Sequence, residues 1–286
     1  MLTSRRSVIA GVCATALPFG RAGATAAEWA DIARLERSRG GRLGVFVHDL
    51  ETGRSAGRRA EERFKLYSTF KGLLAAQVLA EVAAGRERLD APVRFGERDL
   101  MAASPITTAH LAEGSMSVGA MCEAIMHRSD NAAANLLMAR LGGPEKLTAF
   151  LRRLGDDTTR VDNYEGQIAG KPLPLDSTTP RSVVATARTL LTGDGLPFTQ
   201  RTMLERWMDG NVVGRTRLRA AFPADWTAGD RTGTADGICN DYAIARRPGR
   251  APLLVSAYYE APGMELADQE AVLREVGGIV VRWQAG

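Results

Sequence analysis

The stretch Tyr67-Ser68-Thr69-Phe70-Lys71 opens an apolar run that continues to Val78, and its spacing predicts a helix largely buried in a core. In that helix the side chains of Ser68 and Lys71 lie about one turn apart on one face. A serine at a helix start feels the helix dipole, and a lysine whose charge is disfavoured by burial can take the serine's proton. The same two residues also fit an N-capping serine followed by a lysine that extends into solvent.

Outside this helix, the hydrophobic pattern predicts strands near both ends of the chain and helices between them. The expected strands are 43–50, 54–60, 226–232, 238–245 and 253–259. The other expected helices are 28–39, 117–127, 131–141, 145–154, 180–191, 199–208 and 267–283. We therefore expect an α/β (α+β) fold, in which both termini form one antiparallel sheet of about five strands flanked by helices, with an all-helical middle domain.

The expected domain boundaries follow from this pattern. The α/β domain comprises residues 28–66 and 211–286, and the helical domain, residues 67–210, carries the Ser68 helix. A stretch without periodicity, residues 155–176, interrupts the helices, and a long irregular loop inside a compact domain is usually functional. We expect the functional site where the two domains meet.

The first residues have the pattern of an export signal. Arg5 and Arg6 precede the short apolar run Val8–Leu17, and small residues follow at 22–27. About ten apolar residues are too few to span a bilayer. We expect residues 1–27 to be a twin-arginine-type signal peptide that directs the protein to the periplasm.

The charge balance excludes some classes of partner. The chain has 37 basic and 33 acidic residues, and residues 1–27 carry three arginines and no acid. Without that segment the protein is close to neutral, so we expect no nucleic-acid partner and no stable membrane association. We expect a monomer, because the sequence offers no exposed apolar stripe.

The cysteines and histidines are too scattered for a metal site. Cys122 and Cys239 fall in a predicted helix and a predicted strand, and we expect two separate buried thiols. The histidines, His48, His110 and His127, form no cluster with them. We expect no metal and no other cofactor.

Three further motifs fall at the junctions of the predicted layout: Ser129-Asp130-Asn131 between two helices, Glu165 in the irregular loop, and Arg231-Thr232-Gly233-Thr234 at a strand end. With Ser68 and Lys71 they follow the order and spacing in which the chain resembles the class A serine β-lactamases. The resemblance extends to Trp207-Met208-Asp209-Gly210-Asn211 and Asn240-Asp241, and covers nearly the whole chain after residue 27.

The resemblance implies hydrolysis of small-molecule β-lactam antibiotics through an acyl-enzyme, which confers antibiotic resistance. Ser68 would be the nucleophile, and its N–H with that of Thr234 would form the oxyanion hole. Lys71 would activate Ser68, or help Glu165 to do so through a water. Ser129 would pass a proton to the departing nitrogen, and Glu165 would activate water to release the product.

Other residues would bind the substrate or support the site. Asn131 would donate to the side-chain amide of the substrate, and the substrate carboxylate would bind to Arg231, Thr232, Gly233 and Thr234. Arg217 is either a second cation there or a solvated surface arginine. The supporting residues are Asp130, which holds its loop, Asn135, which braces Glu165, and Asp176, which clamps the Glu165 loop.

The sequence departs from the family pattern at several of these positions. Arg231 replaces the usual lysine, which keeps the charge and changes its geometry. Ala169 stands where an asparagine usually helps to hold the hydrolytic water, so deacylation could be slow for some substrates. Asn163 replaces the arginine that usually pairs with the aspartate at Asp176, and we expect a more mobile loop in which Arg160 partly compensates.

Two other functions share much of this signature. A D-alanyl-D-alanine carboxypeptidase or transpeptidase holds its acyl-enzyme for an amine acceptor, whereas Glu165 favours release by water. A β-lactam-binding sensor that deacylates slowly is the third reading, and the loss of the asparagine at Ala169 is the feature that supports it.

Overall fold

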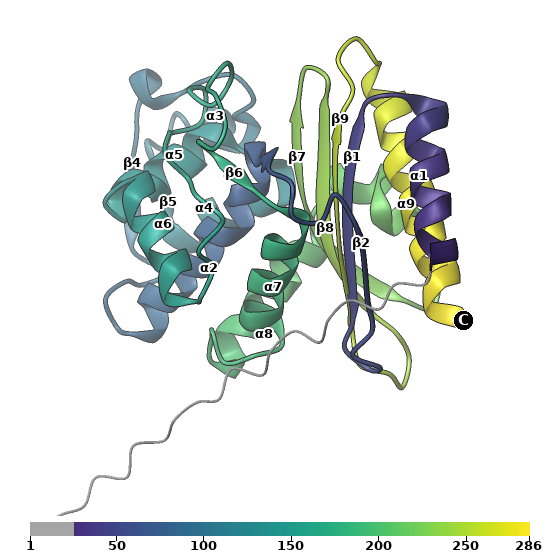
Figure 1. Cartoon of the computed structure of the whole chain (residues 1–286). Helices are drawn as coiled ribbons and strands as arrows, with labels where there is room; N and C mark the ends of the chain where they lie inside the picture. The colour runs from purple at the N-terminus through teal and green to yellow at the C-terminus, as the bar shows by residue number, and fades with distance from the viewer. Residues whose placement is uncertain (1–25) are drawn as a thin grey trace, which may run out of the picture.

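The computed structural model describes residues 26–286, so the predicted signal peptide lies outside the described residues except for its last two positions. Both ends of the described chain contribute to a five-stranded antiparallel sheet of order β2-β1-β9-β8-β7, which confirms the predicted sheet (Figure 1). Its strands are β1 (Arg42–Asp49), β2 (Ser55–Arg58), β7 (Thr227–Ala235), β8 (Ile238–Arg246) and β9 (Leu253–Glu260).

Helices cover both faces of this sheet, so the residues that alternate along each strand are buried on both sides. Val45 and Val255 point toward α1 (Ala26–Arg39) and α9 (Leu266–Ala285), which lie side by side along one face (Figure 1). Phe46 and Leu254 point to the opposite face. On that face α7 (Pro180–Leu191) contacts β1 and β9, and α8 (Phe198–Asp209) contacts β7.

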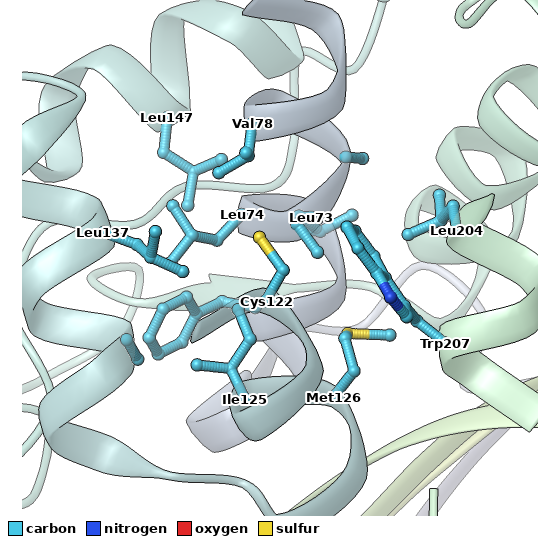
Figure 2. Packing of buried hydrophobic residues seen from close by; sticks show 14 of the residues in the cluster. Leu73, Leu74, Val78, Cys122, Ile125, Met126, Leu137, Leu147, Leu204 and Trp207 are labelled. Carbon is cyan, nitrogen blue, oxygen red and sulfur yellow. The ribbon is translucent and has the colours of Figure 1, made fainter. Parts of the chain in front are cut away.

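The remaining helices pack around α2 (Phe70–Ala83), whose first ten residues are all buried. Its neighbours are α4 (Val118–Arg128), α5 (Asn131–Arg140), α6 (Pro144–Arg153) and α8. Figure 2 shows Leu73, Leu74 and Val78 of α2 among side chains from these helices, such as Leu147 and Trp207, which belong to the same buried cluster. This packing explains the apolar run that follows Ser68, since α2 is surrounded on all sides.

The stretch between β2 and β7 also contains strands, which the expectation of an all-helical middle domain missed. Two short antiparallel pairs occur: β3 (Phe64–Lys65) with β6 (Ser177–Thr178), and β4 (Pro92–Arg94) with β5 (Ser115–Ser117). A short helix, α3 (Pro105–Ala109), was not predicted either. Segments of two to five residues are too short for hydrophobic periodicity to reveal.

Cys122 and Cys239 are free and buried, as predicted. Burial raises the pKa of the Cys122 thiol far above its usual value, which makes it unreactive. Within residues 26–286 no helix is both long and apolar enough to cross a bilayer.

Gly72 allows α2 to approach the sheet closely. A Cβ on this residue would lie 2.0 Å from the hydroxyl oxygen of Tyr242 and 3.3 Å from Cγ of Arg231. Both of those side chains are buried. The position of the Ser68 segment over the sheet therefore depends on a residue without a side chain.

We predict that Gly72→Ala lowers the free energy of unfolding by about 2 kcal/mol, because the added methyl group overpacks a rigid interface. Chemical denaturation measures this change. The matched control is Gly278→Ala on α9, where the nearest atom to a new Cβ is 3.6 Å away. That change should stabilise the protein by up to about 1 kcal/mol. Equal effects of the two substitutions would show that close packing at Gly72 is unimportant.

Candidate active site

Ser68 lies in a 3-10 turn, Tyr67–Thr69, that leads directly into α2. The expected helix therefore begins at Phe70, two residues later than the position of the serine. Tyr67 adopts a φ of 42°, a conformation that costs a non-glycine residue roughly 1 to 3 kcal/mol. Ala103, Ser129 and Asp176 have similar positive φ values, so backbone strain is concentrated around this site.

The ammonium group of Lys71 lies at the centre of the site and is completely buried. Its Nζ is 3.0 Å from Ser68 Oγ, 2.8 Å from the Ser129 carbonyl oxygen and 2.5 Å from Asn131 Oδ1. It also forms an ion pair of 3.0 Å with Glu165 Oε1. Burial lowers the pKa of Lys71 to about 8, although the negative charge of Glu165 opposes that shift.

The carboxylate of Glu165 contacts the same serine. Ser68 Oγ donates a hydrogen bond of 2.7 Å to Glu165 Oε1. Burial raises the pKa of Glu165, but the Lys71 charge and the Ser68 hydrogen bond outweigh it, and the pKa falls below the usual 4.5. Glu165 is therefore ionised at neutral pH, in direct contact with the hydroxyl.

Asn135 holds the backbone of Glu165 from behind. Its Oδ1 accepts the Glu165 N–H at 2.9 Å, and its Nδ2 donates to the Glu165 carbonyl oxygen at 3.2 Å. Asn135 lies on α5, one helical turn after Asn131, so one helix carries contacts to both Glu165 and Lys71. This is the bracing that the sequence predicts for Asn135.

Ser129 ends α4 with a φ of 57° and lies between two cations. Its Oγ is 3.2 Å from Lys71 Nζ and accepts a hydrogen bond of 2.7 Å from Nη2 of Arg231. Arg231 is completely buried, and burial lowers its pKa to about 10. Its guanidinium is therefore directed at Ser129 in the protein interior.

Asp130 organises the loop on which Ser129 lies. This buried carboxylate accepts hydrogen bonds from the N–H groups of Ile106, Thr107 and Ala133, and from the Thr107 hydroxyl, all between 2.8 and 2.9 Å. It thereby caps α5 and ties α3 to it. Its contacts agree with the supporting role expected from the sequence.

Strand β7 brings the third motif against the serine turn. A Cβ on Gly233 would lie 2.7 Å from the Leu66 carbonyl oxygen, so only glycine permits this approach. The next residue, Thr234, is exposed and accepts a hydrogen bond of 2.6 Å from Nη2 of Arg217. Thr232 is buried, and its hydroxyl accepts from Arg231 at 3.2 Å.

The alternative of a solvated Arg217 is wrong, because the side chain is completely buried. Its Nη1 donates to the carbonyl oxygens of Gly233 and Asn240 at 3.1 and 2.9 Å. Its Nε forms an ion pair of 3.2 Å with Glu270 on α9. The pattern of α9 gives no sign that Glu270 contacts this site, and sequence reasoning missed it.

Asp176 closes the loop that carries Glu165. Its Oδ1 accepts the N–H groups of Asp162 and Asn163 at 2.8 and 3.0 Å, and its Oδ2 accepts Nδ2 of Asn163 at 2.5 Å. Arg160 pairs with Asp162, whose Oδ2 accepts the N–H of Asp176. The Asn163 amide therefore takes the place of the arginine that is usual in the family. Greater mobility of the loop stays a prediction.

These side chains come from the Tyr67–Thr69 turn and α2, the α4–α5 junction, the Glu165 loop, the segment at Arg217 and β7, and together they form one network. It contains a hydroxyl, an ionised carboxylate, a buried ammonium and two buried guanidinium groups, which suit acyl transfer to a serine. In the part of the chain that the structure describes, histidine, cysteine and acidic side chains form no group of three that could hold a metal ion.

Comparison with known proteins places this arrangement in a family. The sequence model of the beta-lactamase enzyme family matches residues 28–284. The carbapenem-hydrolyzing β-lactamase KPC of Klebsiella oxytoca is 43% identical over 246 residues, which cover 84% of this chain and 83% of that protein. The β-lactamase SME-1 of Serratia marcescens is 38% identical over 257 residues, 88% of this chain and 87% of that protein.

Solved structures agree with this result. The crystal structure of a β-lactamase from Burkholderia vietnamiensis matches with a TM-score of 0.90 and 52% identity, over 92% of this chain and 98% of that chain. A class A β-lactamase of the last common ancestor of Gram-negative bacteria matches with a TM-score of 0.87 and 46% identity, over 91% of this chain and 100% of that chain. The chain belongs to the beta-lactamase enzyme family and, within it, to the class A serine β-lactamases.

Proposed function

We propose that this protein hydrolyses the β-lactam ring of β-lactam antibiotics through an acyl-enzyme on Ser68, and so confers resistance to them. One observation carries the proposal: Ser68 Oγ lies 2.7 Å from an ionised Glu165 and 3.0 Å from the Lys71 ammonium. A hydroxyl between a base and a cation is an activated nucleophile. The names of the relatives, which include a carbapenem-hydrolyzing β-lactamase, point the same way.

In the acylation step, Glu165 Oε1 takes the proton of Ser68 as Oγ bonds to the lactam carbonyl carbon. The Lys71 charge stabilises the developing alkoxide. The carbonyl oxygen becomes an oxyanion that the N–H groups of Ser68 and Thr234 bind, and the tight contact at Gly233 supports their proximity. As the ring C–N bond breaks, Ser129 passes its proton to the nitrogen and takes one from Lys71. The proton that Glu165 took from Ser68 then moves to Lys71, so Glu165 is ionised again before deacylation.

In the deacylation step, Glu165 takes a proton from water as the water oxygen attacks the ester carbon. The Ser68–carbonyl bond breaks, and the proton returns to Oγ. This second use of Glu165 favours a hydrolase over a D-alanyl-D-alanine peptidase that waits for an amine. Asn135, which holds the Glu165 backbone through two hydrogen bonds, supports both uses.

For the substrate carboxylate we propose a binding position at the exposed Thr234 hydroxyl, with Thr232 beside it and Gly233 between them. Arg217 and Arg231 lie behind these residues and supply positive charge through hydrogen bonds to the two hydroxyl groups. Asn131 is proposed to contact the substrate's side-chain amide, and its Oδ1 also accepts from Lys71.

We further propose that the protein acts in the periplasm after export through a twin-arginine-type signal. Arg5-Arg6 directly before an apolar run of about ten residues supports this proposal. We also propose that the protein acts as a monomer and without a cofactor.

The proposed function is tested by mixing the purified protein, residues 28–286, with a chromogenic cephalosporin while recording turnover and intact mass. We expect many turnovers and no lasting adduct. A single burst with a stable mass increase on Ser68 would support the slowly deacylating sensor. Transfer of the acyl group to an added amine in preference to water would support the peptidase.

Glu165→Gln should retain the fold and lose the base. We predict that kcat falls about 10³-fold, within the usual range for removal of a general base, because acylation and deacylation both lose the group that takes the proton. Asp157→Asn, at an exposed carboxylate in the same irregular stretch, is the control and should turn over within about fivefold of the parent. A Glu165→Gln protein that deacylates at the parental rate would refute the assigned role.

The pH profile of kcat/KM should reveal the charge on Lys71. If Glu165 is the acylation base and Lys71 acts as a cation, kcat/KM is highest while Lys71 is protonated and falls as pH rises through about 8. It also falls in acid, below pH 4.5, as Glu165 is protonated. A kcat/KM that rises through pH 8 would instead identify neutral Lys71 as the base.

A further inference from the structure

Lys65 connects the serine segment to the distal part of the Glu165 loop. It is the last residue of β3, three residues before Ser68, and it pairs with Ser177 of β6. Its Nζ donates to the carbonyl oxygen of Leu175 at 2.7 Å and to that of Pro172 at 3.3 Å. Through these two hydrogen bonds the ammonium group holds residues 172–175, which precede β6 in the loop, close to β3.

Apart from Ile168, whose side chain is buried in the core, residues 166–175 have few attachments to the rest of the protein. The hydrogen bonds within this segment are local turns, such as Gln167 N–H to Tyr164 and Leu175 N–H to Pro172. Ser177, at the end of the loop, donates to the Pro174 carbonyl oxygen. In the part of the chain that the structure describes, Lys65 is the one side chain from outside residues 158–178 that donates a hydrogen bond to this segment.

The charge of Lys65 suits this position. Burial lowers the pKa of its ammonium, whereas the carboxylates of Asp176 and Asp162 oppose that shift. Both carboxylates belong to the clamp that closes the loop. The Lys65 backbone is fixed as well, because its carbonyl oxygen accepts a hydrogen bond of 2.8 Å from Nδ2 of Asn240 on β8. A held backbone and a held ammonium make Lys65 a rigid connection.

Ala169 explains why this connection matters for one half of the reaction. Its side chain carries no hydrogen-bond donor or acceptor, so backbone groups of the loop must complete the contacts of the attacking water beside Glu165. Acylation does not depend on them, since Glu165 already contacts Ser68 at 2.7 Å. The geometry of residues 166–170 therefore affects deacylation more than acylation.

We propose that Lys65 is a positioning residue for deacylation: it anchors the distal part of the Glu165 loop to the Ser68 segment, so that the loop backbone can orient the hydrolytic water. The inference rests on the proposed function. It goes further in assigning the rate of one step to a residue that does not touch the substrate.

The test compares three variants in the purified protein. Lys65→Met keeps the length of the side chain and removes its donors, and Lys65→Arg keeps the charge and the donors. Lys171→Met is the matched control, because Lys171 is exposed on the same loop. Stopped-flow measurements with a chromogenic cephalosporin give the acylation rate, and the decay of the acyl-enzyme in intact mass spectra gives the deacylation rate. Hydrogen exchange of residues 166–175 reports on the anchor itself.

We expect Lys65→Met to slow deacylation about tenfold and acylation less than about twofold, with faster exchange in residues 166–175. Lys65→Arg should restore deacylation to within about threefold, and Lys171→Met should match the parent. Unchanged deacylation in Lys65→Met, equal slowing of both steps, or an equal effect of Lys171→Met would overturn the proposal. If the parent itself fails to turn over, the proposed function fails, and unchanged exchange in Lys65→Met would still refute the anchor.

Discussion

The ammonium group of Lys71 lies in the protein interior with five oxygen atoms of four residues around it. Removing such a charge from water is costly, and the surrounding oxygen atoms offset only part of the cost: the fall of its pKa to about 8 leaves a net penalty on the order of 3 kcal/mol. The oxygen atoms that offset part of this cost belong to Ser68, Ser129, Asn131 and Glu165. The residues proposed for catalysis and binding are therefore held together by the need to solvate one buried charge.

The rest of the fold keeps these oxygen atoms in place. The apolar surface of α2 is surrounded by helices, so the serine turn cannot move independently of the core. Gly72 lets α2 approach Tyr242 and Arg231 of the sheet, and Gly233 lets β7 approach the turn that carries Ser68, at distances that no side chain would permit. The strained backbone at Tyr67 and Ser129 is retained because this packing over-determines it. Stability of the core and geometry of the site thus have a common cause.

The sequence predicts the sheet, most helices and the residues of the site, because long periodic segments and spaced motifs are local signals. It does not predict the contacts that depend on three-dimensional approach. Arg217 is buried between β7, β8 and α9, and its partner Glu270 lies 53 positions away. Lys65 reaches carbonyl oxygens more than 100 positions distant. The sequence also does not predict the clamp by Asn163, because the hydrogen bonds of its side-chain amide and its backbone N–H to Asp176 depend on the folded loop.

The most direct measurement is an NMR titration of the lysine side chains, of which the chain has four: Lys65, Lys71, Lys146 and Lys171. With ¹³C at the ε carbon, each gives a signal that shifts on deprotonation, and a Lys71→Arg variant assigns the one in the site. We expect Lys71 to titrate near pH 8, while Glu165 is ionised. Titration of Lys71 near its ordinary value of 10.5 would contradict the buried, ion-paired ammonium on which the site depends.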